Sequence, residues 1–121
     1  MKGALLIAGL LGATGVAAGA FGAHALEAVV MPERLKVWET AAYYHLIHAA
    51  VILVLALSER EGEQRWRLPV VGFTVGVCLF SFSLYALVLT GTTTLAMITP
   101  IGGLCLVLSW LGLMIKALKW E

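Results

Sequence analysis

Three long stretches of this chain contain no Asp, Glu, Lys or Arg, and their lengths constrain the fold more than any other feature. The uncharged stretches are residues 3–26, 40–58 and 68–115. A helix needs roughly 20 apolar residues to cross about 30 Å of hydrocarbon. The first two stretches therefore fit one crossing each. The third fits two, provided that the chain turns near the sequence TGTTT at residues 90–94.

The lengths of these stretches predict an all-α integral membrane protein built as a four-helix bundle. Helices are expected rather than strands because each segment must satisfy its own backbone hydrogen bonds in lipid. The longest polar segment, SEREGEQRWR at residues 58–67, is too short for a separate domain. Residues 1–121 are therefore expected to form a single transmembrane domain. Its expected helices cover residues 3–26, 38–57, 69–89 and 97–118.

The overall composition agrees with a membrane protein and argues against a nucleic-acid partner. Hydrophobic residues make up 61% of the chain and charged residues 12%, whereas soluble domains carry roughly 25% charged residues. The formal net charge of +1 gives no basic surface for nucleic acid. Cys78 and Cys105 fall inside the expected third and fourth helices, where a thiol is expected to be an inert packing group.

The N-terminal segment superficially resembles a signal peptide. Lys2 precedes an apolar run that ends in the sequence AHA at residues 23–25. The apolar run is longer than the usual signal core of about 7–15 residues. We therefore expect this segment to stay attached as the first span.

Basic residues are distributed unevenly between the two sides of the expected four-crossing arrangement. One side carries Arg34 and Lys36. The other side carries the larger group: Lys2, Arg60, Arg65, Arg67, Lys116 and Lys119. In short loops such an excess is typical of the cytoplasmic side, so both termini are expected in the cytoplasm. Trp66 and Trp120 lie beside the larger group and Trp38 lies at the opposite end, where interfacial aromatic anchors are expected.

Glycines recur along the expected helices at spacings that let neighbouring backbones approach. Because lipid gives helices no hydrophobic reason to associate, close van der Waals contact between small residues contributes to packing. The glycines expected at helix contacts are Gly12, Gly15, Gly19, Gly22, Gly72, Gly76, Gly102 and Gly103. A tightly packed bundle is the favoured interpretation. A ligand path along the glycine face and self-association of the chain are the alternatives.

Polar side chains gather in the half of the bundle that lies away from the termini. Thr40, Tyr44 and His48 are spaced i, i+4, i+8 and share one face of the second helix. A rise of about 1.5 Å per residue puts His24 at the outer interface and His48 near the centre of the membrane. The candidate polar cluster consists of His24, Thr40, Tyr44, His48, Ser81, Ser83, Tyr85 and Thr99.

These polar groups are expected to turn toward one another, because an unpaired polar group in hydrocarbon is costly. The simplest pairing joins His48 to Ser or Tyr hydroxyls of the third helix. A neutral histidine is expected there, since desolvation disfavours the charged form. Thr99 is placed to cap the fourth helix or to satisfy backbone groups near Pro100.

A polar core that fixes the register of the helices is favoured over other roles for the cluster. A metal site would use His45 and His48 with His24 or Glu27, and a haem would use His48 with His24. The chain has neither an H-E-x-x-H motif nor a CxxC pair, so no metal, cofactor or catalytic residue is assigned. Proton or ion conduction normally shows Asp or Glu within a span, and the expected spans hold none away from their ends.

Four motifs, in order along the chain, resemble a known family. They are GAFGAH at 19–24, WxTxxxYxxxH at 38–48, FSxSLYxLxLTG at 80–91 and TPIGG at 99–103. Together they resemble the domain-of-unknown-function 423 family, small bacterial membrane proteins with relatives such as transmembrane protein 256. The resemblance covers nearly the whole chain. It implies a four-helix, multi-pass protein of the bacterial inner membrane without an established biochemical activity.

The resemblance also ranks the site residues. His24 and His48 match motif positions, whereas His45 stands where the family is expected to have a residue such as Gln, which argues against a shared metal site. Phe82 replaces a small residue between two serines, which argues against an open cavity beside the third helix.

Two classes of function follow, and a protein without enzymatic activity is favoured over an enzyme. In the first, the protein is structural or accessory and packs in the lipid bilayer against itself or a larger membrane complex. In the second, the polar cluster binds a lipid head group, a small ligand, a metal or a proton.

Overall fold

The structure, a computed structural model, describes residues 2–119, and these residues contain helices and no strands. The first span combines α1 (Lys2–Val16), η1 (Ala17–Gly22) and α2 (Ala23–Leu26). Within it, η1 is a π-helix, and the N–H of Ala23 donates to the carbonyl of Ala18, five residues earlier. The first span therefore contains one widened turn in its outer half.

The remaining helices are α3 (Pro32–Ser58), α4 (Arg67–Thr90), the 3-10 helix η2 (Thr93–Met97) and α5 (Thr99–Leu118). α3 begins at Pro32 rather than near residue 38. The sequence around its start explains the difference, because proline is favoured at the first helical positions and Glu33 in the first turn suits the helix dipole. α4 ends at Thr90 and is capped by Gly91, whose φ of 71° is left-handed and whose N–H donates to the carbonyl of Leu87.

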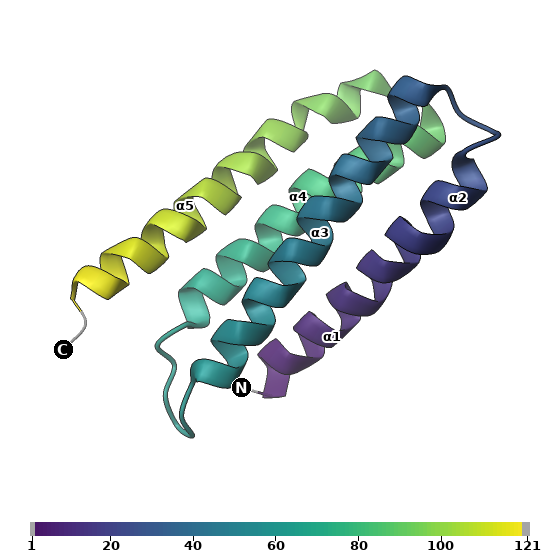
Figure 1. Ribbon diagram of the computed structural model, residues 1–121. Helices are drawn as coiled ribbons and strands as arrows, with labels where there is room; N and C mark the ends of the chain where they lie inside the picture. The colour runs from purple at the N-terminus through teal and green to yellow at the C-terminus, as the bar shows by residue number, and fades with distance from the viewer. Residues whose placement is uncertain (1, 120–121) are drawn as a thin grey trace.

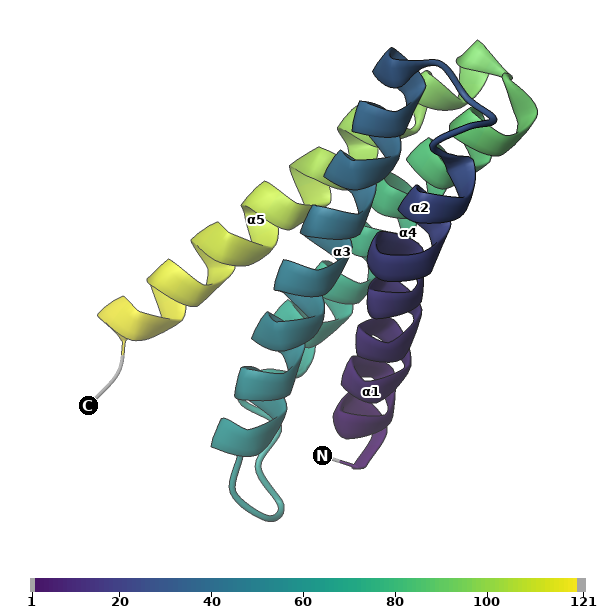
Figure 2. The same cartoon turned by 45° about the vertical axis from the view of Figure 1, so that its right-hand side comes forward.

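The helices pack side by side in chain order. The extensive contacts join α1 to α3, α3 to α4 and α4 to α5. Figure 1 and Figure 2 show that both ends of the described chain and the loop between α3 and α4 lie at one end of the bundle. The turn between α2 and α3 and the helix η2 lie at the other end, called the outer end below.

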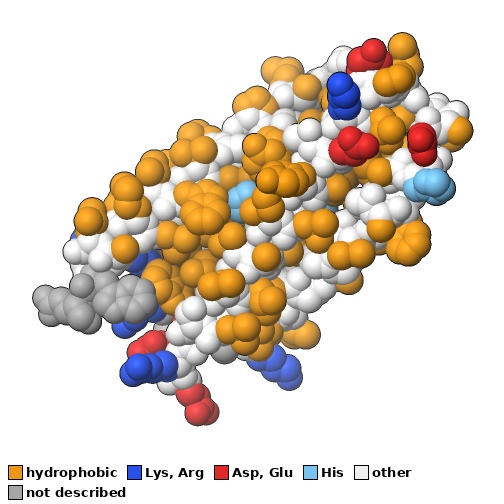
Figure 3. All heavy atoms as spheres, viewed as in Figure 1, with side chains coloured by type: hydrophobic (Ala, Val, Ile, Leu, Met, Phe, Trp, Pro, Cys, Tyr) orange, Lys and Arg blue, Asp and Glu red, His pale blue; other side chains and the backbone are white. Residues whose placement is uncertain are grey.

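Among the described residues, four helical spans are long and apolar enough to cross a membrane. Charged side chains gather toward the two ends of the face seen in Figure 3, with a largely hydrophobic band between them. The expected all-α fold with four membrane-spanning helices is confirmed. The spans are Lys2–Leu26, Pro32–Ser58, Arg67–Thr90 and Thr93–Leu118.

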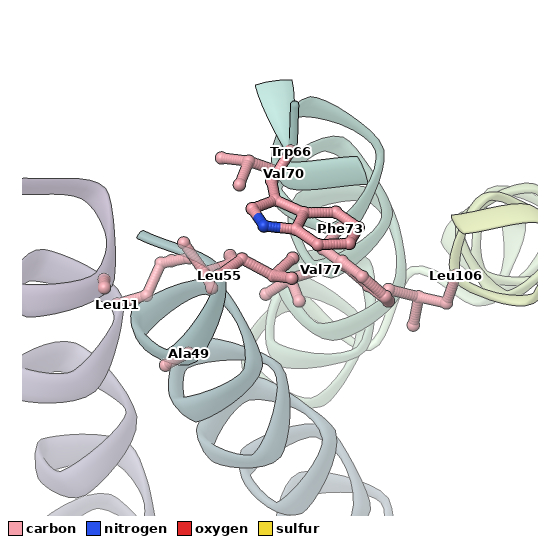
Figure 4. Packing of buried hydrophobic residues seen from close by; sticks show 10 residues of the cluster. Leu11, Ala49, Leu55, Trp66, Val70, Phe73, Val77 and Leu106 are labelled. Carbon is pink, nitrogen blue, oxygen red and sulfur yellow. The ribbon is translucent and has the colours of Figure 1, made fainter. Parts of the chain in front are cut away.

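The main hydrophobic core lies where side chains from all four spans converge. Phe73 and Val77 of α4 and Ile52 of α3 lie at its centre, and Leu11 and Leu106 reach it from α1 and α5. Figure 4 shows Leu11, Phe73, Val77 and Leu106 converging from different helices. In lipid, such close contact replaces the hydrophobic effect as the reason for the helices to associate.

The tryptophans differ from the expected arrangement of interfacial anchors. Trp66 is buried in the main core cluster and Trp38 in a second cluster at the outer end. Both side chains therefore face other helices rather than lipid. Trp120 lies outside the described residues.

The glycines named from the sequence occupy different environments. A Cβ added at Gly102 would collide with the backbone of Leu79 and Phe80, and one added at Gly76 would lie 2.6 Å from Leu106. Gly19 and Gly103 would make ordinary contacts, and a Cβ on Gly12 would meet nothing within 4 Å. The other positions where a Cβ would collide with a neighbouring helix are Gly15, Gly22 and Gly72.

Candidate functional site

His45 lies at the centre of the polar contacts and joins three helices. Its side chain is 1% exposed. The ring Nε2 lies 3.1 Å from the hydroxyl of Thr14 on α1, and Nδ1 lies 2.9 Å from the hydroxyl of Tyr85 on α4. One side chain of α3 is thus bonded to both of the helices that flank it.

The hydrogen-bond partners determine which nitrogen of His45 carries the proton. The Thr14 hydroxyl donates to the carbonyl of Leu10 at 2.8 Å, so its oxygen is left to accept from Nε2–H. Nδ1 is then the acceptor for the hydroxyl of Tyr85. Because burial disfavours a charged imidazole, we assign His45 as neutral with its proton on Nε2.

His48 lies one turn further along α3 and takes the opposite tautomer. Its Nδ1 lies 2.8 Å from the carbonyl of Tyr44, which can only accept, so Nδ1 carries the proton. Its Nε2 accepts from the indole N–H of Trp110 on α5 at 3.2 Å. The side chain is 4% exposed, and both ring nitrogens are engaged.

The expected pairing of His48 with hydroxyls of the third span is wrong. The hydroxyl of Tyr85 bonds His45, and the hydroxyl of Ser81 donates to the carbonyl of Ala41 at 2.8 Å. The cause is the direction of the two rings: that of His45 points between α1 and α4, while that of His48 points toward α5. His45, against which the family resemblance argued, therefore makes the bond to a tyrosine hydroxyl that was expected of His48.

Ser83 and Thr99 form a separate hydroxyl pair between α4 and the start of α5. Their oxygens lie 2.7 Å apart, and the hydroxyl of Ser83 donates to the carbonyl of Phe80 at 2.9 Å. The hydroxyl of Thr99 is thus the donor in the pair. It links two helices and makes no capping hydrogen bond at the start of α5.

His24 and Thr40, which belong to the predicted cluster, make no hydrogen bond to His45 or His48. The side chain of His24 is 85% exposed, and its Nδ1 lies 3.7 Å from a carboxylate oxygen of Glu27. Thr40 is exposed and lines a shallow depression with the neighbouring residues Lys36, Glu39, Tyr43 and Tyr44. The ring of Tyr44 also stacks on that of His48, with 6.1 Å between their centroids.

Trp38 makes a further contact between α3 and the first span. Its indole N–H donates to the carbonyl of Ala18 at 2.8 Å, inside the π-helix η1. The ring fits against Gly22, where an added Cβ would lie 2.7 Å from ring carbon Cζ2. The widened turn of η1 thereby offers both an acceptor and the space for the indole.

The network leaves little capacity for a ligand. No buried side-chain nitrogen or oxygen among residues 2–119 lacks a hydrogen-bond partner. Over the same residues no group of three or more His, Cys, Asp or Glu side chains is close enough to hold a metal ion. Because both nitrogens of each buried histidine are already used, a ligand would have to break existing bonds in order to bind.

Sequence reasoning missed His45, Thr14 and Trp110 as members of the network. Two signals were present in the sequence. Thr14 is the one hydroxyl residue in the uncharged stretch 3–26, and Trp110 lies within an uncharged stretch rather than at its end. A polar group in a span needs a partner, either on its own helix or on another. The two signals mark Thr14 and Trp110 as candidates for interhelical bonds, but they do not identify the partners.

The sequence is similar to known membrane proteins over nearly its whole length. A family model described as "Protein of unknown function (DUF423)" matches residues 18–103. The UPF0382 membrane protein YwdK of Bacillus subtilis is 34% identical over 99% of each chain. The UPF0382 membrane protein SERP0230 of Staphylococcus epidermidis is 36% identical over 99% of this chain and 98% of its own.

A relative also occurs in fission yeast. The UPF0382 membrane protein C1782.12c of Schizosaccharomyces pombe is 34% identical over 90% of this chain and 96% of its own. No solved structure matches. The expected family and the expected location in a membrane are confirmed.

Proposed function

Because this chain belongs to the DUF423 family of membrane proteins, we propose that it is a structural or accessory multi-pass membrane protein. In this proposal the polar network formed by the hydrogen bonds of His45 and His48 locks the four spans together. The chain acts as one transmembrane domain that packs against itself or a larger membrane complex, and it catalyses no reaction.

The single observation that carries this proposal is the position of His45. The side chain is buried between α1, α3 and α4, and each of its nitrogens is bonded to a different neighbouring helix. A binding or proton-carrying histidine needs a free nitrogen or a path to solvent. A histidine saturated by protein partners instead fixes the relative positions of the helices that it joins.

Both termini are proposed to face the cytoplasm. The support is the excess of Lys and Arg at the end of the bundle that carries the termini and the α3–α4 loop. In this orientation the polar network extends from the middle of the membrane into its outer half.

Equilibrium unfolding of the purified protein in detergent tests the locking role. The variant His45→Ala removes both interhelical bonds, so the free energy of unfolding is expected to fall by about 1–2 kcal/mol, since a single such bond in a membrane protein contributes roughly 0.6 kcal/mol and up to about 1.7. His24→Ala is the matched control, because that side chain is exposed at the outer end. Its stability is expected to equal that of the wild type.

A binding role would give a different pattern. His45→Ala would then also lose a metal ion or small molecule that co-purifies with the unaltered protein, and adding that ligand would stabilise the wild type but not the variant. Elemental analysis and mass spectrometry of the same samples distinguish the two outcomes.

A further inference from the structure

α4 and α5 pack closely from the outer end of the bundle to past their midpoints and separate only near the end that carries the termini. A Cβ added at Gly102 or Gly76 would collide with the partner helix, and one added at Gly72 would collide with the side chain of Ser109. One added at Gly112 would meet nothing within 4 Å. In both Figure 1 and Figure 2 the C-terminal half of α5 leans away from α4. The separation leaves a groove of about 650 Å³ between the two helices.

The walls of this groove are apolar. Val71 and Val75 line it from α4, and Leu108 and Ile115 line it from α5. Ser109 also faces the groove, but its hydroxyl donates to the carbonyl of Cys105 at 2.8 Å, within its own helix. The groove therefore suits a hydrocarbon chain rather than a polar ligand.

One end of the groove is cationic. Lys116 and Lys119 line it at the end where α5 finishes, and no acidic side chain among the described residues lines it. The long stems of lysines near the end of a span let their ammonium groups reach the level of the lipid phosphates. An apolar groove that ends at two such ammonium groups complements both the acyl chain and the negatively charged head group of an anionic phospholipid.

We propose that this groove binds one acyl chain of an anionic phospholipid, with the phosphate held by Lys116 and Lys119. The lipid belongs to the leaflet on the side of the two termini. Along α4 the groove runs from Leu68 to Val75, a rise of about 10 Å. The hydrocarbon of one leaflet is about 15 Å thick, so the groove covers the part of the chain nearest the head group.

The same charges argue against a second copy of the protein as the occupant. A two-fold interface along this groove would place the same patch of both chains together. Lys116 and Lys119 would then face their own copies, and like charges that face each other across an interface are unfavourable. The cationic end favours an anionic lipid instead.

Lipid titration of the full chain in detergent, measured by native mass spectrometry, tests this proposal. The probes are dioleoyl phosphatidylglycerol and dioleoyl phosphatidylcholine, which carry the same acyl chains. The anionic lipid is expected to bind more tightly. Lys116→Ala/Lys119→Ala is expected to weaken its binding by at least roughly fivefold, because each basic residue near a membrane surface contributes about that factor. The same variant is expected to weaken binding of the zwitterionic lipid less, because the choline ammonium offsets the charge of its phosphate.

A second variant fills the groove itself. Gly112→Leu is expected to weaken the binding of both lipids. Gly9→Leu, which adds the same side chain on an open face of α1, is expected to leave the binding of both lipids unchanged. The matched charge control is Lys2→Ala/Arg60→Ala, which removes two basic side chains near the same end of the bundle but outside the groove. It is expected to bind both lipids like the wild type.

Three results would overturn the proposal. The first is an equal loss of affinity for the anionic lipid in Lys116→Ala/Lys119→Ala and in Lys2→Ala/Arg60→Ala, which would indicate binding to a general basic surface. The second is wild-type lipid binding by Gly112→Leu. The third is conversion of an oligomer to a monomer by Gly112→Leu, which indicates that another protein chain fills the groove. Lys116 and Lys119 are not among the residues that the glycines contact between α4 and α5. The lysine variants therefore test the proposal even if Gly112→Leu fails to fold.

Discussion

The indole N–H of Trp110 donates to Nε2 of His48 at 3.2 Å and so joins α5 directly to α3. Trp110 also packs edge-on against Phe73, with 5.1 Å between the ring centroids. Its side chain is 46% exposed, so one part of the ring faces lipid while the N–H faces inward. Trp110 thus separates a buried polar histidine from the hydrocarbon of the membrane.

The variant Trp110→Phe tests this relationship. Phenylalanine keeps an apolar ring over His48 but removes the donor, and Nε2 is left without a partner in hydrocarbon. The free energy of unfolding is expected to fall by about 1 kcal/mol. Double-mutant analysis with His48→Phe should show that the two losses are not additive. Additive losses would mean that the indole stabilises the protein only by its bulk.

The two buried histidines are expected to be opposite neutral tautomers. Nitrogen-15 NMR of histidine-labelled protein should show the proton on Nε2 of His45 and on Nδ1 of His48. Tyr85→Phe is expected to shift the Nδ1 resonance of His45 and to destabilise the protein by about 1 kcal/mol, because the acceptor loses its donor. Tyr43→Phe, at an exposed position, serves as the control. The same tautomer at both histidines would contradict the assigned network.

Adjacent glycines of α5 should differ sharply in their tolerance of alanine. In Gly102→Ala the new methyl group meets the backbone of α4, which cannot move aside as a side chain can. A loss of about 1–3 kcal/mol is expected from such overpacking. In Gly103→Ala the nearest atom is a ring carbon of Phe80 at 3.7 Å, so stability should stay within about 0.5 kcal/mol. Equal effects in thermal unfolding would contradict the close approach of α4 and α5.

The proposed orientation can be tested by labelling of cysteines in intact cells. In a Cys78→Ser/Cys105→Ser background, Thr92→Cys places a thiol at the outer end and Glu61→Cys places one in the loop between α3 and α4. A maleimide that cannot cross membranes is expected to label the first variant in intact cells and the second only after lysis. The reverse pattern would show that the termini face outward.

The membrane spans were predictable because they follow from the absence of charge alone. A charged side chain within hydrocarbon is costly, so the long uncharged and apolar stretches 3–26, 40–58 and 68–115 indicate where the spans lie. The start of α3 was less predictable. The charged residues between Pro32 and Trp38 are helical although they lie at the end of the span, and the hydrophobic pattern does not extend to them.

The partners within the polar network were not predictable from spacing. α3 packs against α1 on one side and α4 on the other, and both sides of the helix are apolar. The sequence shows that His45 and His48 lie about one turn apart, but it does not show which neighbour each ring faces. That choice depends on how the helices are arranged around α3, which only the tertiary structure supplies.

The packing of the spans in chain order has a consequence for biogenesis. Each span after the first packs against the span made just before it, so a growing chain can build the protein by successive docking as it leaves the ribosome. The bond from Trp110 back to His48 is an exception, because it can form only when the last span has arrived. That bond therefore closes the assembly rather than starting it.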